Sequence, residues 1–225
     1  MNDLLLYDKE IVCLNCEKKF KTKRVRASKI VVKKKDSDFC MYYEGEINPY
    51  YYEINVCPHC SFAFSASFKS LRPAVRENLR KNYLERAGQV DLCGKREIAD
   101  ALRSFKLALL CGTLADENTF NLGGICLRIA WLNRYLGQKE EEDKYLDKAL
   151  ECYQEVYEKV DITSLPLSEH KLLYLLGELN GRLGRFTETR AWFNILFSKR
   201  GIEPALNTLA REQWDEYKTA MANAL

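Results

Sequence analysis

The chain has 225 residues, of which 47% are apolar and 30% are charged. This composition is too apolar for a mainly disordered chain, and the length suits one large domain or two smaller ones. No apolar run approaches the roughly 20 residues that a membrane-spanning helix needs. Residues 1–8 lack the basic start and the long apolar segment of a signal peptide, so we expect a cytoplasmic protein. Nine cysteines, an odd number, suit metal ligands and free thiols better than a complete disulfide framework.

Basic side chains are concentrated near the N-terminus, although the net charge of the chain is only +3. Ten Lys or Arg residues and no Asp or Glu lie between Lys18 and Lys35. From Leu71 onward, 23 basic and 23 acidic residues cancel. A basic segment of this kind is typical either of a solvated surface or of a surface that contacts phosphates.

The first 70 residues have the pattern of a small β-rich domain. Residues 30–32 and 52–56 are candidate strands, and the second alternates apolar and polar side chains as a half-buried strand does. Asn48-Pro49 marks a turn. Five tyrosines fall in the same stretch: Tyr42, Tyr43, Tyr50, Tyr51 and Tyr52. We predict a zinc-ribbon-like domain over residues 1–70 and a second, helical domain over residues 71–225.

The strongest chemical prediction comes from two Cys-x-x-Cys pairs, Cys13 with Cys16 and Cys57 with Cys60. Two intervening residues allow both thiolates of a pair to face one ion, and two such turns supply the four ligands of a tetrahedral Zn²⁺. Redox-active pairs usually begin a helix in a βαβ unit, which this segment lacks. Four cysteines leave no coordination position for water, so the predicted zinc site is structural rather than catalytic.

The separation of the two pairs is unusual. Between Cys16 and Cys57 lie 40 residues, whereas common zinc ribbons have roughly 15–20. The basic segment and the tyrosines occupy this excursion. A domain of about 70 residues has a thin core, and structural zinc contributes on the order of 10–16 kcal/mol of apparent binding energy to folding. We therefore expect the metal-free protein to lose this half first.

Other residues in the N-terminal half have less specific patterns. Cys40 is a candidate spare ligand or redox thiol, although such a cysteine is more often simply half-buried. Asp36 and Asp38 suggest acid–base chemistry, but two aspartates beside a basic segment more often form ion pairs or a turn. His59 is an alternative ligand within the second pair. In the helical half, we expect His170 to face solvent in an early helical turn.

From about Arg72 the apolar residues recur with the period of helices. Pro73 suits a first helical turn, and glycines fall between the apolar stripes where helices end. Six or seven helices in antiparallel pairs are predicted, which makes the fold class α+β, mainly α. The stripes occupy residues 98–109, 125–136, 145–157, 172–183 and 206–217.

The helical half also carries a weak internal period. Leu176, Gly177, Gly184, Phe193 and Leu196 follow the order of tetratricopeptide positions, in which a small residue lets paired helices approach. A second set, Ala130, Gly137, Leu146 and Ala149, has the same relative positions. Ala108, from a third and partial set, lies 41 residues before Ala149, and Leu196 lies 47 residues after it, against 34 in the standard repeat. Asn180 and Thr189 stand where an aromatic residue and an alanine are usual. We predict a degenerate repeat array; a plain helical bundle is the alternative.

The sequence resembles an uncharacterised bacterial family, domain of unknown function 2225. The resemblance rests on the segments 6–9, 13–20, 36–40, 43–45, 48–49, 56–60, 107–111 and 127–132. It spans nearly the whole chain, and each segment alone is a weak motif. The resemblance implies a bacterial cytosolic protein with a zinc-ribbon-like N-terminal part followed by tetratricopeptide-like helices. It implies no activity.

Three functions fit these patterns. We favour a non-catalytic zinc-binding protein that acts as an interaction module or adaptor, because stacked helix pairs leave a concave face that commonly binds a protein or peptide. Binding of nucleic acid through the segment from Lys18 to Lys35, with tyrosines stacking on bases, is the alternative. A thiol redox sensor based on Cys40 is a third.

Enzymatic activity is left open, with a non-catalytic protein favoured. No Walker-type loop, GxSxG elbow, HExxH helix or dinucleotide fingerprint occurs in the sequence. Two histidines leave few candidates for His-based catalysis. We expect no contact with membranes.

Overall fold

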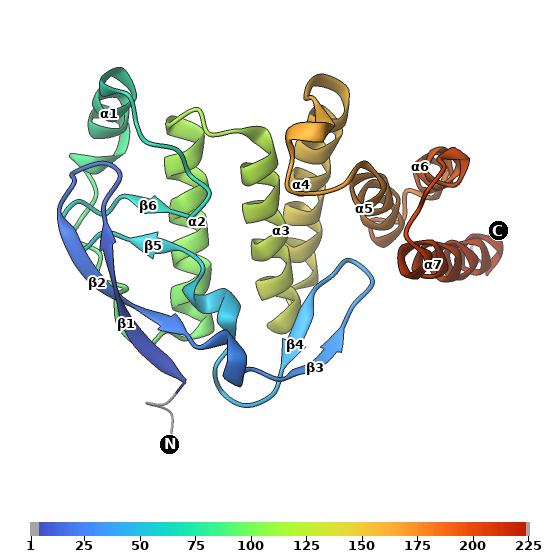
Figure 1. Cartoon of the computed structure of the whole chain (residues 1–225), viewed down its shortest axis with the longest axis horizontal. Coiled ribbons are helices and arrows are strands. Elements are labelled where there is room, and N and C mark those ends of the chain that lie inside the picture. Colours follow the sequence, from blue (N-terminus) through green and yellow to red (C-terminus); the bar gives the residue numbers. More distant parts are fainter. Residues whose placement is uncertain (1–4, 224–225) are drawn as a thin grey trace.

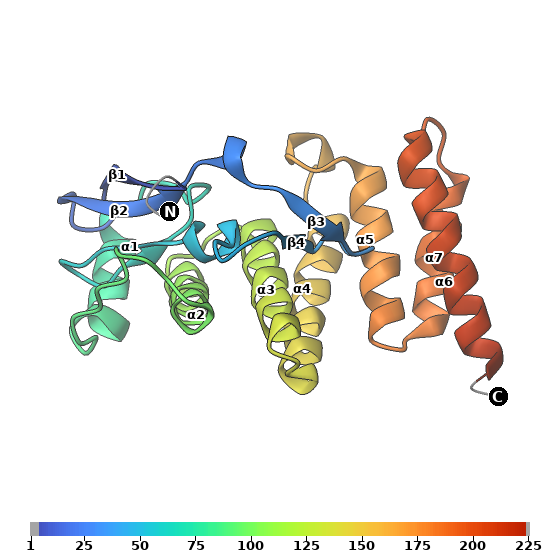
Figure 2. The same cartoon turned by 90° about the horizontal axis from the view of Figure 1, so that it is seen from below.

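A computed structural model describes residues 5–223 of the chain. Figure 1 shows a row of helices with short strands at the N-terminal end, and Figure 2 shows that these strands line one side of the row. We expect no signal peptide in residues 1–8, and residues 1–4 of that segment lie outside the described residues. No described helix is long and apolar enough to cross a membrane.

Within residues 5–223, the strands form three separate two-stranded antiparallel sheets rather than one larger sheet. They pair in chain order: β1 (Leu6–Val12) with β2 (Lys19–Val25), β3 (Val32–Lys35) with β4 (Met41–Tyr43), and β5 (Asn55–Val56) with β6 (Ala63–Phe64). Small sheets of this size need support from other elements, because an isolated hairpin is marginally stable in water. The helices and the core described below supply that support.

The two predicted strands have different bounds in the structure. The first, residues 30–32, overlaps β3 at Val32 alone, and the second is reduced to Asn55 and Val56. Just before it, Pro49–Tyr52 forms a 3-10 turn, because the Asn48 side chain accepts a hydrogen bond from the Tyr50 amide at 3.0 Å. The alternating pattern there therefore belongs partly to a capped turn rather than to a strand.

Seven α-helices follow within the described residues, as the helical periodicity predicts. Each predicted apolar stripe falls on one of them. The helices are α1 (Pro73–Leu79), α2 (Ile98–Leu114), α3 (Thr119–Tyr135), α4 (Lys139–Lys159), α5 (Glu169–Arg182), α6 (Phe186–Ser198) and α7 (Pro204–Asn223). The chain is α+β and mainly α.

Polar caps and glycines fix the ends of the central helices. Asn118 caps α3 by accepting from the Asn121 amide, and Ser168 caps α5 by accepting from the Lys171 amide. Beyond the C-terminal ends of α3 and α5, Gly137 and Gly184 have φ of +68° and +71°. Glycine adopts this left-handed conformation without steric cost, so both helices end in a tight turn into the next helix.

Two helical hairpins, α3 with α4 and α5 with α6, carry matching features 47 residues apart. In each first helix a buried asparagine donates to the carbonyl four residues earlier: Asn133 to Ile129 at 2.8 Å, and Asn180 to Leu176 at 2.7 Å. Asn180 therefore replaces the usual aromatic residue with a buried amide that is satisfied within its own helix. The assignment of these hairpins to tetratricopeptide repeats stays a prediction.

One continuous buried core joins the strands to the helices. It runs from Cys13 to Leu179 and so crosses residue 70 without interruption. A smaller cluster joins α5, α6 and α7 through Tyr174, Phe193 and Leu206. The division into domains at residue 70 stays a prediction, and the shared core shows that the two regions are packed together.

Candidate metal centre and an internal charged cluster

The four predicted cysteine ligands lie together, and we call them the thiol cluster. Cys13 and Cys16 follow β1, whereas Cys57 and Cys60 follow β5. All four sulfur atoms lie within 4.8 Å of one another. No other group of three or more His, Cys, Asp or Glu side chains in residues 5–223 is arranged to hold a metal ion. The sequence spacing therefore identified the one candidate metal centre in this part of the chain.

The sulfur–sulfur distances suit a tetrahedral ion. Cys13 Sγ lies 3.7 Å from Cys60 Sγ, and Cys16 Sγ lies 3.7 Å from Cys57 Sγ. A tetrahedron with zinc–sulfur bonds of about 2.3 Å has edges of about 3.8 Å. A metal ion therefore fits among these thiols without rearrangement of the two turns.

The two cysteine turns have nearly the same backbone. The carbonyl of Cys13 accepts from the Glu17 amide at 3.0 Å, and that of Cys57 accepts from the Ser61 amide at 2.8 Å. Glu17 and Ser61 both have left-handed φ, 61° and 59°. Each turn is thus held by its own hydrogen bonds and places its two thiols on one side.

The neighbours of the thiol cluster are apolar or hydrogen-bonding. Phe62 is fully buried and Phe20 is nearly so, and the Asn15 side-chain amide donates to Cys60 Sγ at 3.6 Å. His59 is directed elsewhere: its Nε2 lies 3.3 Å from the carbonyl oxygen of Lys19. The structure therefore gives no support to His59 as a replacement for a cysteine ligand.

Cys40 lies apart from the thiol cluster, in the hairpin between β3 and β4. Its side chain is completely buried, and its thiol donates to the Tyr135 hydroxyl at 3.7 Å. Burial raises the pKa of the Cys40 thiol to about 12. A redox sensor needs an accessible thiolate, so this environment opposes the redox hypothesis.

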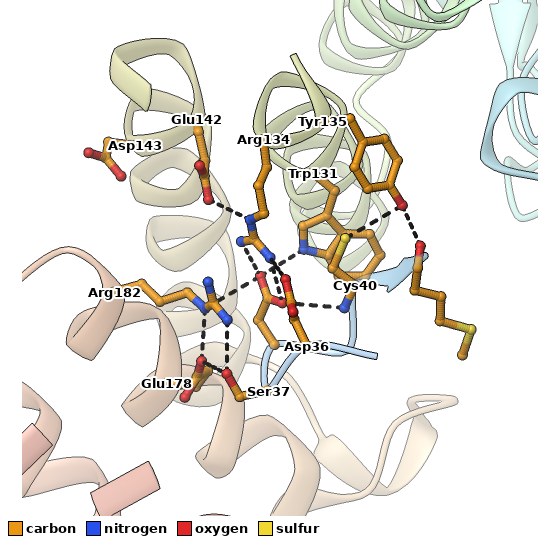
Figure 3. A network of polar contacts seen from close by, with 12 residues as sticks. Asp36, Ser37, Cys40, Trp131, Arg134, Tyr135, Glu142, Asp143, Glu178 and Arg182 are labelled. Carbon is orange, nitrogen blue, oxygen red and sulfur yellow. Dashed lines mark hydrogen bonds and ion pairs between the residues drawn. The ribbon is translucent and has the colours of Figure 1, made fainter. Parts of the chain in front are cut away.

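A second constellation surrounds the tip of the same hairpin, and we call it the charged cluster (Figure 3). Its central residue, Asp38, is completely buried and accepts from Trp131 Nε1 at 2.9 Å. The other ionisable members come from the hairpin and from α3, α4 and α5: Asp36, Arg134, Glu142, Glu178 and Arg182.

Arg134 holds three carboxylates of the charged cluster. Its guanidinium lies 3.0 Å from Asp36, 2.6 Å from Asp38 and 2.7 Å from Glu142. Burial alone would raise the pKa of Asp38, but hydrogen bonding and charge from Arg134, together with the charge of Arg182, outweigh burial and lower it. The ion pairs predicted for Asp36 and Asp38 are confirmed, and no acid–base chemistry is needed to explain them.

The other side of the hairpin tip contacts α5. Ser37 Oγ donates to Glu178 at 2.6 Å, and Arg182 donates to both Glu178 and Ser37 at 2.8 Å. The Tyr174 hydroxyl donates to the Ser37 carbonyl at 2.9 Å. Burial raises the pKa of Glu178, and one of its carboxyl oxygens is buried without a partner. The helices thus bind an acidic turn of their own chain.

Arg134 and Arg182 were not singled out from the sequence. They lie 96 and 145 residues from their hairpin partners Asp38 and Ser37. Asp36 does pair locally with Lys34, so the charge pattern around the two aspartates contained no signal for these distant arginines. Nothing local identified which arginines these would be.

Comparison with known proteins assigns the family. The family model described as "Uncharacterized protein conserved in bacteria (DUF2225)" matches residues 6–217. The chain belongs to this family. An uncharacterised protein of Borreliella burgdorferi (strain ATCC 35210 / DSM 4680 / CIP 102532 / B31) is 30% identical over 143 residues, which cover 55% of this chain and 51% of that protein. The chain thus spans about half the length of this curated relative. No solved structure matches.

The basic segment of this DUF2225 protein is partly neutralised by acidic neighbours. Lys19 pairs with Glu10 at 2.8 Å, and Lys23 pairs with Asp8 at 3.0 Å, across the β1–β2 sheet. Lys34 pairs with Asp36 of the charged cluster at 2.7 Å. Phosphate binding along this segment would compete with these ion pairs, although binding of nucleic acid there stays a prediction.

The tyrosines beside the basic segment are part of the interior. The Tyr50 hydroxyl accepts from the Met41 amide at 3.0 Å, and the Tyr52 hydroxyl accepts from the Arg96 amide at 3.1 Å. Both side chains are buried. These two rings are therefore not available to stack on exposed bases, which removes part of the basis for the nucleic-acid hypothesis.

Proposed function

We propose that this protein is a non-catalytic zinc-binding interaction module. The observation that carries the metal part is the thiol cluster, whose four sulfur atoms have the spacing of a tetrahedral zinc site. Four protein ligands complete the coordination of zinc, so the ion has no position for a substrate or a catalytic water. Its role is structural.

Zinc in this position closes a long loop. It joins the turn after β1 to the turn after β5, with 40 residues between Cys16 and Cys57. Those residues include the hairpin of the charged cluster. Closure of a flexible loop costs entropy that a metal can offset, because its binding energy becomes folding energy. The metal would thus hold the hairpin near the helices that bind it.

The helices provide the proposed protein-binding surface. They already bind one acidic turn of the chain, residues 36–40, through side chains on α3 and α5. Beside this segment, a hollow of about 360 Å³ is lined by Tyr42, Tyr51, Ile98 and Leu136 among others. Leu136 is 42% exposed at the end of α3. We infer that a protein partner places an apolar side chain in this hollow.

Metal analysis of the purified protein tests the first part of the proposal. We expect one zinc ion per chain in the wild type and loss of zinc in Cys60→Ser. Cys93→Ser is the matched control, because Cys93 contacts the Val56 carbonyl near the site but lies outside the thiol cluster. Wild-type protein without zinc, or full zinc content in Cys60→Ser, would contradict the proposal.

Affinity capture from a lysate of its own organism, with and without nuclease, tests the second part. A captured protein that survives nuclease should then bind the purified chain directly and lose affinity for Leu136→Asp. Val160→Asp is the control, since Val160 is 40% exposed but lies beyond α4 at the opposite end of the hairpin. Equal binding by both variants would count against the hollow, and loss of all partners after nuclease would favour the nucleic-acid alternative.

A further inference from the structure

A second cavity lies away from both clusters, where the segment after β6 meets α2, α3 and α4. It has a volume of about 270 Å³. Phe105, Ile125 and Phe120 form apolar parts of its wall, and Tyr153 and Arg128 contribute polar groups. We call it the Gly124 cavity, after the α3 glycine in its wall. Pockets of roughly this size with a few polar groups are typical of small-molecule sites.

Gly124 has no packing reason to be a glycine. It stands inside α3, where glycine is the least favourable residue after proline. An added Cβ would meet only the Tyr153 hydroxyl, at 4.0 Å. The preceding Gly123 is different, because its Cβ would lie 3.0 Å from both Cys152 and the Tyr153 ring. Gly123 is needed for helix packing, whereas the missing side chain of Gly124 keeps the cavity open.

Tyr153 supplies an unpartnered polar group to this cavity. The side chain is only 4% exposed, and its hydroxyl forms no hydrogen bond with any described residue. The hydroxyl oxygen itself is not fully buried, so water or a bound molecule in the cavity can reach it. The hydroxyl lies next to Gly124 on the cavity wall, where a bound molecule would satisfy it.

The mouth of the cavity is cationic. Arg128 donates from Nε to Glu53 at 3.0 Å, and its two terminal amino groups have no hydrogen-bond partner among the described residues. Its guanidinium is fixed over the rings of Tyr50 and Trp131, 4.7 and 4.3 Å from their centroids. A guanidinium held in this way presents its free amino groups without further loss of entropy.

A second, more open hollow of about 530 Å³ adjoins the first. The two share Glu53, Ser65, Ser67 and Arg128 in their walls. The open hollow adds Arg24, which donates only to neutral acceptors, the Tyr52 carbonyl and the Asn55 side chain. Two guanidinium groups thus face one carboxylate around the shared region, which leaves a net positive charge beside an apolar cavity.

We propose that the Gly124 cavity binds a small organic anion. The free amino groups of Arg128 receive its carboxylate or phosphate group, and the positive charge of Arg24 adds to the attraction. The apolar body of the ligand contacts Phe105 and Phe120, and its edge hydrogen-bonds to the Tyr153 hydroxyl. The site is separate from the thiol cluster and does not depend on the proposed adaptor function.

Titration of the full-length protein with phenyl phosphate, followed by amide NMR, tests the site. We expect the amides of residues 65–67 and 124–128 to shift with a Kd at or below about 1 mM. Inorganic phosphate, which lacks the apolar body, and benzyl alcohol, which lacks the anion, should each bind at least tenfold more weakly. Absence of shifts in these segments, or equal shifts with inorganic phosphate, would overturn the proposal.

Three variants separate a binding site from a merely structural cavity. Gly124→Ala should keep or raise the melting temperature and weaken phenyl phosphate binding about tenfold, because its methyl group occupies the cavity. Tyr153→Phe should leave stability unchanged and weaken binding about fivefold. Gly123→Ala should lower the melting temperature, which confirms the contrast between the two glycines. Unchanged binding in both Gly124→Ala and Tyr153→Phe would contradict the proposal.

Discussion

The thiol cluster and the charged cluster both fasten the N-terminal strands, but over very different distances in the chain. The thiol cluster joins two turns that begin at Cys13 and Cys57, and both belong to the strand region. The charged cluster joins Asp38 to Arg134 on α3, and Ser37 to Arg182 on α5. The first therefore organises the strands themselves, whereas the second fixes them on the helices.

The two clusters also differ in how their parts depend on one another. A bound zinc ion makes the four thiolates one unit, and loss of one ligand weakens the whole site. In the charged cluster, the cost of burying Asp38 is offset only while Arg134 and Trp131 remain in place. Removal of a single partner there leaves an uncompensated buried charge. Damage to the thiol cluster therefore costs metal binding, whereas damage to the charged cluster costs the pairing of buried charges.

Loss of the metal should have the largest effect. Cys57→Ser, or treatment with a strong chelator, removes apparent binding energy on the order of 10 kcal/mol. We expect hydrogen exchange measured by mass spectrometry to rise in β1, β2, β5 and β6. Helices α5 and α6 should stay protected, since they share a second buried cluster with α7. A uniform rise over the whole chain would show that the thiol cluster does not act locally.

Removal of the central carboxylate should have the next largest effect. Asp38→Ala leaves Arg134 without one of its buried partners and should lower the free energy of unfolding by about 3–5 kcal/mol. Asp143→Ala is the control, because the exposed Asp143–Lys139 pair is worth no more than about 0.5 kcal/mol. Urea unfolding gives both values.

Zinc content distinguishes the two clusters in the same variant. Asp38→Ala should keep its full zinc content, because the strands still hold the thiol cluster. Loss of zinc together with stability would mean that the two clusters are one cooperative unit, and the contrast drawn above would fail.

The thiol cluster was predictable from the sequence because its geometry is local. Two residues between cysteines set the direction of both thiols, and the backbone of each turn repeats the pattern. The helices were predictable for a similar reason, since a period of 3.6 is visible within one element. Asp36 and Asp38 were predicted to form ion pairs, but Arg134, which pairs with both, lies about 100 residues away.

The parts that could not be predicted depend on tertiary contacts. Tyr52 lies in the predicted strand over residues 52–56, yet its hydroxyl accepts from the Arg96 amide in the interior, as the Tyr50 hydroxyl accepts from the Met41 amide. These contacts favour a turn at Pro49–Tyr52 over a longer strand. In the same way, the open space beside Gly124 depends on where the neighbouring helix α4 places Tyr153, which no local sequence pattern indicates.

Acidification should release the metal before it opens the charged cluster. The pKa of Asp38 is lower in the folded protein than in the unfolded chain, where it is about 3.9. Its contribution to stability is therefore complete above about pH 4 and is lost as the pH falls through the folded value. The contribution of Glu178 to stability changes with pH in the opposite direction. Burial raises the pKa of Glu178, so the folded protein binds this proton at a higher pH than the unfolded chain does. Zinc binding weakens as thiolates are protonated.

The indole N–H resonance of Trp131 reports the charged cluster directly, since this group donates to Asp38. We expect it to stay in place between pH 7 and about pH 5, while a zinc-sensitive dye detects release of the metal. Asp38→Asn should shift the resonance at every pH and leave zinc release unchanged. Movement of the indole resonance together with zinc release would show that the two clusters are coupled.

The smallest predicted effect compares the two halves of the thiol cluster. Glycine relieves the left-handed φ of Glu17 and of Ser61 equally, by roughly 1 kcal/mol. Glu17→Gly also loses an exposed ion pair with Arg76, so its net effect on unfolding should lie within about 0.5 kcal/mol of zero. Ser61→Gly loses a buried hydroxyl that donates to the Gly88 carbonyl and accepts from the Val90 amide.

Because the Val90 amide is then left buried without a partner, Ser61→Gly should destabilise the protein by about 1–2 kcal/mol in urea unfolding. The difference between the two variants measures how firmly the second turn is tied to residues 88–90, a tie that Glu17 of the first turn lacks. Equal effects of the two substitutions would mean that the turns are interchangeable. The thiol cluster would then depend on the metal alone, rather than on the chain packed around its second turn.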